Sequence, residues 1–181
     1  MTESEHKPSH HGHHHRKQEK ASVPTLVVTV SDTRTLETDT GGALVAEFLT
    51  EAGHPVIERV IVADDGDAIQ SALRQALARE DVRAVILTGG TGVAPRDVTP
   101  ESVEPLLERV VPGFGELFRM LSYEDIGSAA LLSRAMAGLA DGRVVFVIPG
   151  SRGAVRLAME KLIVPEIGHL AAEAIKRPES A

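Results

Sequence analysis

Apolar and polar positions repeat along the chain in the order of a short buried run, a polar turn and an amphipathic helix. Three runs rich in β-branched residues predict strands at Thr25–Val30, Val56–Val62 and Ala84–Thr88. Apolar residues spaced three and four apart follow the first two runs and predict a helix after each. Their buried faces are Leu44, Val45, Phe48, Leu49 and Ala52, and then Ile69, Ala72, Leu73, Ala76 and Leu77.

The second half of the chain is less regular. A helix is predicted from apolar residues that follow a Pro-Gly-Phe-Gly separator at 112–115, namely Leu117, Phe118, Met120 and Leu121. For 122–139 the alanine content favours helix, whereas pairing of 134–139 with 143–148 across Asp141-Gly142 suits an antiparallel hairpin. We expect a short helix followed by the hairpin, and then a closing helix over 164–175.

These elements predict an α/β fold, a single three-layer α/β/α domain with a mostly parallel sheet and one antiparallel hairpin at its edge. At 181 residues the length suits one domain, which we place at 23–177, between a polar segment at 1–22 and a short tail at 178–181. Right-handed crossovers would bring the loops after the first three strands and the last one to a single edge. Open α/β sheets bind their ligands at that edge.

The loop after the third predicted strand has the composition of an anion-binding loop. Gly89, Gly90 and Gly92 leave the backbone free to adopt positive φ and bring its N–H groups close to an oxyanion. Arg96 adds a fork-shaped donor, and Asp97 adds a carboxylate that could face a metal. The alternative is a glycine-rich turn in which Arg96 and Asp97 pair with each other.

Known nucleotide motifs do not describe this loop. It lacks the Gly-Lys-Ser/Thr of a Walker A loop and fails the Gly-x-Gly-x-x-Gly pattern of dinucleotide-binding folds. Thr99 is expected to cap the next helix, with Pro100 at its first position and Val98 and Val103 as a hydrophobic staple.

Polar residues also follow the other parallel strands. Gly41 and Gly42 open the first helix, and three carboxylates after the second strand offer either a cation site or helix capping. For each loop the alternative is plain turn geometry. Because four loops converge, they form one candidate site: Ser31, Asp32, Asp64, the stretch from Gly89 to Asp97, Gly150 and Ser151.

The composition of the chain argues against several classes of function. The formal net charge is -7, with no basic surplus that would indicate nucleic acid or an anionic membrane as partner. The absence of cysteine excludes disulfides, thiolate metal sites and a cysteine nucleophile. No apolar run has the length of a membrane span, and no signal-peptide core is present near the start, so we expect a soluble cytoplasmic protein.

The first 22 residues are polar and hold six histidines, at positions 6, 10, 11, 13, 14 and 15. We expect disorder there. Crowded imidazoles could chelate nickel, zinc or copper, and the alternative is a solvated or expression-derived tail. His169, in the closing helix, is expected to be a packed or surface histidine rather than a ligand.

The stretch Thr88–Glu101, TGGTGVAPRDVTPE, resembles the signature of the molybdenum cofactor biosynthesis family that includes the MogA and MoaB proteins. The resemblance extends over about 25–172. It takes in Val30-Ser31-Asp32, Asp64, and the segments 112–116, 132–134 and 148–151. The loop at 149–153 is more similar to the MoaB branch than to the MogA branch.

This resemblance implies a molybdopterin-binding fold, assembled as a homotrimer or homohexamer and compatible with contact to a molybdate-insertion protein. For the MogA branch it implies transfer of AMP from ATP to molybdopterin, with Mg²⁺. Asp64 and Asp97 match two functionally important aspartates and are expected to hold Mg²⁺ and orient the nucleotide. The MoaB-like loop leaves open a non-catalytic molybdopterin-binding or partner-binding protein. The substrate-binding residues implied are Ser31, Asp32, Gly41, Gly42, Gly89, Gly90, Thr91, Gly92, Arg96, Thr99, Pro100, Gly150 and Ser151.

Overall fold

The computed structural model describes residues 21–176, so the predicted tail at 178–181 and all but the last two residues of the predicted tail at 1–22 lie outside the described residues. Six strands form one sheet in the order β2-β1-β3-β6-β5-β4. Their bounds are β1 Thr25–Val30, β2 Val56–Val62, β3 Ala84–Thr88, β4 Arg109–Val110, β5 Met136–Ala140 and β6 Arg143–Ile148. The four strands β2, β1, β3 and β6 are parallel, whereas β5 pairs antiparallel with β6 and β4 pairs antiparallel with β5.

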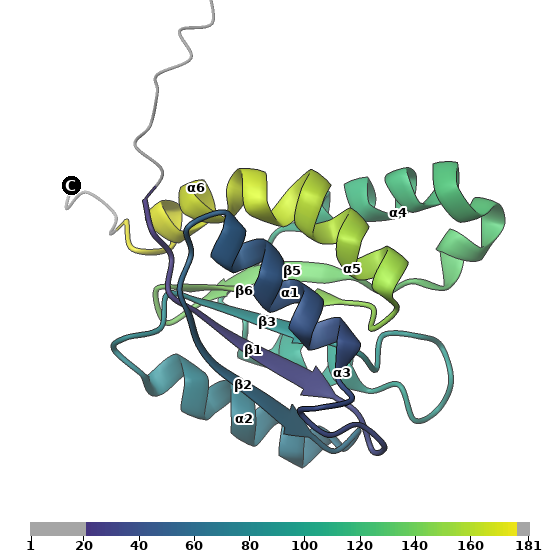
Figure 1. Ribbon diagram of the computed structural model, residues 1–181, viewed down its shortest axis with the longest axis horizontal. Coiled ribbons are helices and arrows are strands. Elements are labelled where there is room, and N and C mark those ends of the chain that lie inside the picture. Colours follow the sequence, from purple (N-terminus) through teal and green to yellow (C-terminus); the bar gives the residue numbers. More distant parts are fainter. Residues whose placement is uncertain (1–20, 177–181) are drawn as a thin grey trace, which may run out of the picture.

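Helices cover both faces of the sheet and confirm the predicted three-layer fold (Figure 1). On one face lie α1 Thr40–Glu51, α4 Pro112–Ile126, α5 Arg152–Ala158 and α6 Val164–Ala174, with a π-helical turn, Met159–Ile163, joining the last two. On the other face lie α2 Gly66–Ala78 and α3 Thr99–Val103. No helix within 21–176 is both long and apolar enough to cross a membrane.

Alternate residues of each central strand enter two separate cores. On β3, Ile86 packs with residues of α1, α4 and α5, whereas Val85 and Leu87 pack with α2 and α3. Strands buried on both faces require continuous apolar runs, which is why the sequence pattern located them correctly. Because all four parallel strands end at the same edge, the loops that follow them meet there.

The predicted hairpin is confirmed as β5 and β6, but it is not the outermost pair, because the two-residue β4 lies beyond β5. The predicted separator at 112–115 is wrong: it forms the first turn of α4. Pro112 is tolerated there because the first helical turn needs no backbone N–H from it. The predicted short helix is a 3₁₀ segment, Gly127–Leu132.

The predicted cap of α3 is also wrong. Thr99 is the first residue of the helix, and the capping position is Val98, which makes no side-chain hydrogen bond. The Thr99 hydroxyl instead donates to the carbonyl oxygen of Gly89 at 2.9 Å. α3 is a single turn that continues as a 3₁₀ segment, Glu104–Leu106.

Asp39 ties the start of α1 to two strands. One carboxylate oxygen accepts from the Gly42 N–H at 2.8 Å, and the other accepts from Thr29 and from Arg59, each at 2.8 Å. A Cβ on Gly42 would lie 2.2 Å from this carboxylate, so only glycine fits. Burial alone would raise the pKa of Asp39, but these hydrogen bonds outweigh it and hold the pKa below its usual range.

Replacing Asp39→Asn is expected to lower the free energy of unfolding by about 2 kcal/mol at pH 7, because Arg59 loses its counter-charge. An unfolded aspartate titrates near pH 3.9. The stabilisation by ionised Asp39 is therefore present above that pH and is lost as the pH falls through the lower folded value. Urea denaturation from pH 7 to pH 3 should show the gap between wild type and variant closing on acidification. Glu47→Gln, an exposed carboxylate of α1, is the control, and a gap independent of pH would contradict the assignment.

Candidate functional site

The loop after β3 passes closely against its neighbours. Gly89 has φ of +106°, and a Cβ there would lie 2.4 Å from the carbonyl oxygen of Val30 at the end of β1. Gly90 has φ of +63°, and its Cβ would lie 2.9 Å from Oδ1 of Asp64. Both glycines are therefore required by backbone conformation and by space. The loop also lies against Asp64, as the convergence of loops predicted.

Arg134 holds the far side of this loop and was missed as a site residue. Its guanidinium donates to the carbonyl oxygens of Gly92 at 2.8 Å and Asp97 at 2.5 Å, and it forms an ion pair with Glu101. Its backbone N–H donates to the carbonyl oxygen of Thr91 at 3.2 Å. The only sequence signal was its place in the Leu-Ser-Arg segment at 132–134.

Asp97 does not pair with Arg96. Its Oδ2 accepts from the backbone N–H of Ala94 at 3.0 Å, and the described ion pairs include none between Asp97 and Arg96. Glycine is also required at position 92, because a Cβ there would lie only 2.7 Å from Oδ2 of Asp97. The turn thus fixes the carboxylate beside the loop backbone and leaves the Arg96 side chain exposed.

The carboxylates after β2 have different roles. Asp65 caps α2 by accepting from the Ala68 N–H at 3.0 Å, which confirms the capping alternative for that residue. Asp64 does not cap: its buried Oδ1 has no hydrogen-bond partner among the described residues. Burial raises the pKa of Asp64, and the charges of Asp97 and Asp32 raise it further, against the opposing effect of Arg96.

An unpaired, buried carboxylate oxygen close to two other carboxylates suits a hard cation. Within 21–176, however, there is no group of three or more histidine and carboxylate side chains placed to hold a metal ion. Protein atoms alone would not complete a coordination sphere here. Water molecules or oxygens of a bound ligand would have to supply the remaining ligands.

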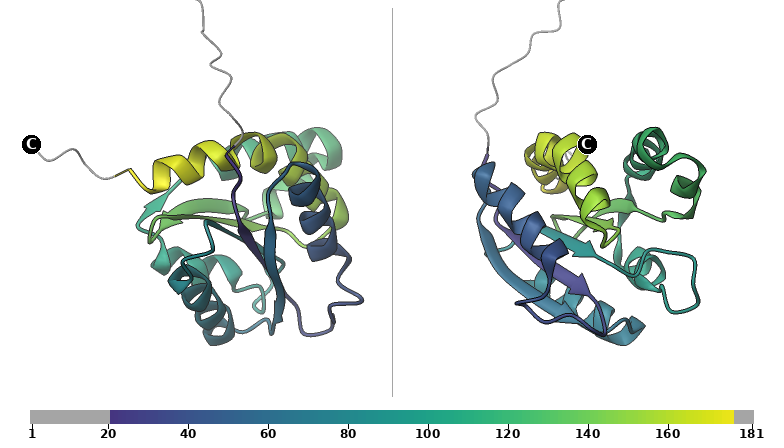
Figure 2. Two further views of the ribbon diagram at one scale, coloured as in Figure 1. Left: turned by 60° about the vertical axis from the view of Figure 1, so that its left-hand side comes forward. Right: turned by 45° about the vertical axis from the view of Figure 1, so that its right-hand side comes forward.

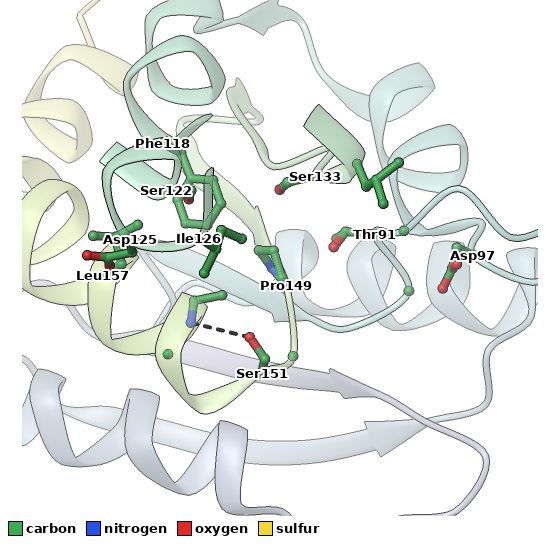
Figure 3. A pocket seen from close by; sticks show the side chains of 16 residues that line it. Thr91, Asp97, Phe118, Ser122, Asp125, Ile126, Ser133, Pro149, Ser151 and Leu157 are labelled. Carbon is green, nitrogen blue, oxygen red and sulfur yellow. Dashed lines mark hydrogen bonds between the residues drawn. The ribbon is translucent and has the colours of Figure 1, made fainter. Parts of the chain in front are cut away.

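Two hollows meet at this edge of the sheet. A cavity of about 410 Å³ lies between the glycine loop, α4 and the start of α5 (Figure 3). A smaller hollow of about 160 Å³ lies beside it and is lined by Ser31, Arg34 and Gly41, among others. Gly150 lines both. The ridge between them is backbone, since a Cβ on Gly150 would contact Cα of Gly89 at 3.4 Å.

The structure places many of the predicted site residues along these two hollows, whereas Asp32, Asp64 and Arg96 line neither of them. Lining the larger cavity are Gly90, Thr91, Gly92, Asp97, Gly150 and Ser151, and lining the smaller one are Ser31, Gly41, Gly89 and Gly150. Oδ1 of Asp32 accepts a hydrogen bond from the backbone N–H of Asp64 at 3.0 Å. Three others are buried beneath the site and shape it without facing a hollow: Gly42, Thr99 and Pro100.

The sequence patterns did not predict that α4 forms part of the site. The wall of the larger cavity includes Phe118, Ser122, Asp125 and Ile126. These positions recur at helical spacing on one face of α4, where two polar residues interrupt apolar ones. That interruption was the available signal. Figure 2 shows the loop after β3 projecting from the end of the molecule where α4 lies.

Comparison with known proteins identifies the family. A family model described as a probable molybdopterin binding domain matches residues 26–169. The molybdenum cofactor biosynthesis protein B of Bacillus anthracis is 56% identical over 160 residues, which are 88% of this chain and 95% of that protein. The chain belongs to the MogA and MoaB family of molybdenum cofactor biosynthesis proteins.

Solved structures of MoaB-type family members agree with the fold. A crystal structure of a molybdenum cofactor biosynthesis protein B matches with a TM-score of 0.86 and 53% identity, over 88% of this chain and all of that one. The tungsten cofactor synthesizing protein MoaB from Pyrococcus furiosus matches with a TM-score of 0.78 and 36% identity, over 86% of this chain and 98% of that one. The chain is accordingly MoaB-type, as its loop at 149–153 indicated.

Replacing Arg134→Ala is expected to loosen the loop from Gly92 to Asp97, because two carbonyl oxygens lose their donor. Amide hydrogen exchange at Ala94 and Asp97 should accelerate on the order of tenfold, equivalent to about 1.4 kcal/mol of local stability. Glu101→Gln, which removes the ion pair and keeps both carbonyl contacts, is the matched control. Unchanged exchange in Arg134→Ala would show that the loop is held by other contacts.

Proposed function

We propose that this protein binds molybdopterin and ATP at the carboxyl edge of its sheet and transfers AMP to the terminal phosphate of molybdopterin. The observation that carries the proposal is the pair of hollows that meet across Gly89 and Gly150. A ridge without side chains allows two bound molecules to approach each other closely. Membership in the molybdenum cofactor biosynthesis family supports the choice of substrates.

The reaction requires little covalent chemistry from the protein. An oxygen of the molybdopterin phosphate attacks the α-phosphorus of ATP, the bond from that phosphorus to the bridging oxygen breaks, and pyrophosphate leaves. The nucleophile is already an anion, so no general base is needed. The protein must align two polyanions and exclude competing water. A loop fixed by Thr99 and Arg134 suits that task, because its geometry does not depend on the ligand.

Mg²⁺ fits the carboxylates at this site. We propose that Asp64 and Asp97 hold it together with substrate phosphate oxygens, since Oδ1 of Asp64 is buried and has no hydrogen-bond partner within 21–176. When bound, the cation would neutralise phosphate charge. Asp32 would position Asp64 through its hydrogen bond to the Asp64 N–H.

A non-catalytic molybdopterin-binding protein is the second candidate. It is favoured by the MoaB-type similarity of this chain. Such a protein would bind molybdopterin in the same cavity. It would form no product when ATP is added.

The deciding measurement is pyrophosphate release from ATP by the full-length protein with molybdopterin and Mg²⁺. Asp64→Asn and Asp97→Asn are each expected to lower turnover on the order of a hundredfold, because the charge that organises the phosphates is lost. Asp67→Asn, an exposed carboxylate in the first turn of α2, is the control and should keep full activity.

No pyrophosphate from freshly prepared wild type, with molybdopterin binding intact, would establish the non-catalytic candidate. Circular dichroism and thermal unfolding of the two variants separate a functional loss from misfolding. Unfolding of Asp64→Asn would assign Asp64 a structural role.

We also propose that the chain assembles as a homotrimer or homohexamer through α4 and the 3₁₀ segment after it. Leu117, Met120 and Leu131 are exposed there, with Leu131 at 75%. Leu131 also lines a groove of about 470 Å³ with Val110, Pro112 and other residues. An exposed apolar surface of this kind favours association with a second copy.

Light scattering coupled to size exclusion should give a mass of three or six chains for the wild type. Leu131→Glu is expected to shift it to monomers, because a charge would be buried in the contact. Ile175→Glu, also at an exposed apolar residue but beyond α6, is the control. A monomeric wild type would refute the assembly.

A further inference from the structure

A glutamate and a histidine lie side by side on the exposed surface of α6. Oε2 of Glu166 is 3.5 Å from Nδ1 of His169, and both side chains are more than half exposed. Residues three apart share one face of a helix, and a Glu-x-x-His pair at this spacing can bind a single metal ion. His169 is a surface histidine, as the sequence predicted, and the carboxylate beside it makes the pair a candidate for two metal ligands.

The described part of α6 does not complete a metal site. Glu173 is 3.4 Å from Nε2 of His169, but its carboxylate also bonds to Lys176 at 2.5 Å. The part of the chain that the structure describes holds no group of three or more histidine and carboxylate side chains that could bind a metal ion. Zinc in a structural site takes four ligands. The Glu-x-x-His pair supplies two, so two more must come from outside the described residues.

The N-terminal segment joins the described chain next to this pair. Val23 is 2% exposed, and its backbone N–H donates to Nδ1 of His54 at 3.2 Å, which anchors the chain there. Two residues earlier, the carbonyl oxygen of Ala21 lies 3.8 Å from the position that a Cβ on Gly168 would take. Gly168 is part of the Glu-x-x-His segment. The first 20 residues are therefore attached beside the two candidate ligands of α6.

The attached segment contains six histidines, five of them within positions 10–15. His15 and His10 stand six and eleven residues before Ala21. An extended chain spans about 3.3 Å per residue, so these two imidazoles can reach about 20 and 36 Å from that point. Covalent attachment keeps them at high local concentration near α6, and closing so short a loop costs little entropy. Two further ligands are thus within reach of the pair.

We propose that Glu166 and His169 bind a divalent transition-metal ion together with two imidazoles from positions 10–15 of the same chain. Imidazole suits zinc, nickel and copper, and the chain has no cysteine to offer a thiolate instead. One carboxylate and three imidazoles give zinc a complete tetrahedral set. Figure 1 shows α6 at the end of the sheet where β1 starts, away from the carboxyl edge, so the inference does not rest on the proposed function.

The test is a Zn²⁺ titration of the full-length protein against a chromophoric chelator. Loss of even an outer-shell partner of a metal weakens binding by tenfold or more. His169→Ala and Glu166→Gln should therefore each raise the Kd for Zn²⁺ on the order of tenfold or more. Glu160→Gln, at an exposed carboxylate of the π-helical turn before α6, is the matched control and should bind Zn²⁺ as wild type does.

A full-length variant with alanine at all five histidine positions within 10–15 should lose at least as much affinity as His169→Ala. If that variant loses zinc binding but His169→Ala and Glu166→Gln keep wild-type affinity, the site lies in the N-terminal segment alone and the inference is overturned. Wild-type affinity in the five-alanine variant would overturn it as well.

Light scattering distinguishes imidazoles of the same chain from those of another molecule. One equivalent of Zn²⁺ should leave the mass of the wild-type protein unchanged. A rise in mass that depends on His169 would show that zinc links separate molecules, which contradicts a site formed within one chain.

Discussion

The close approach of backbone segments at the carboxyl edge of the sheet is the constraint on which the rest of the site depends. Gly89 lies against the end of β1, Gly150 lies against Gly89, and a Cβ on Gly41 would lie 3.1 Å from the carbonyl oxygen of Gly150. No side chain fits between these segments. Two hollows can therefore share a thin ridge of backbone.

Two aspartates at this edge illustrate opposite uses of a buried charge. Asp39 is fully satisfied by Gly42, Thr29 and Arg59, and its carboxylate is stabilised in the ionised form. Asp64 has a buried oxygen without a hydrogen-bond partner in the described part of the chain, and it lies near two like charges, which disfavour its ionised form. Burying an unpaired charge costs free energy, so a position that keeps it is a candidate for ligand binding rather than for stability.

α4 and the segment after it connect the site to the rest of the surface. One face of α4 walls the larger cavity, other residues of the helix are exposed and apolar, and the chain then returns to the site through Arg134. Ser133 lines both the cavity and the outer groove. The outer groove and the glycine loop are thus separated by a few residues only, so the proposed contact between copies would lie close to the site.

Local sequence signals predicted the five longer strands, the three layers and the edge where the loops meet. Buried strands need continuous apolar runs, and the Asp141-Gly142 turn has the positive φ values that a tight hairpin requires, so both signals are local. Four features became visible only in the folded chain: the partner of the Thr99 hydroxyl, the three carbonyl contacts of Arg134, the short β4 and the cavity face of α4. Each of these features depends on contacts between residues that are far apart in the sequence. A residue's neighbours in the sequence therefore do not indicate which partner its side chain contacts in the fold.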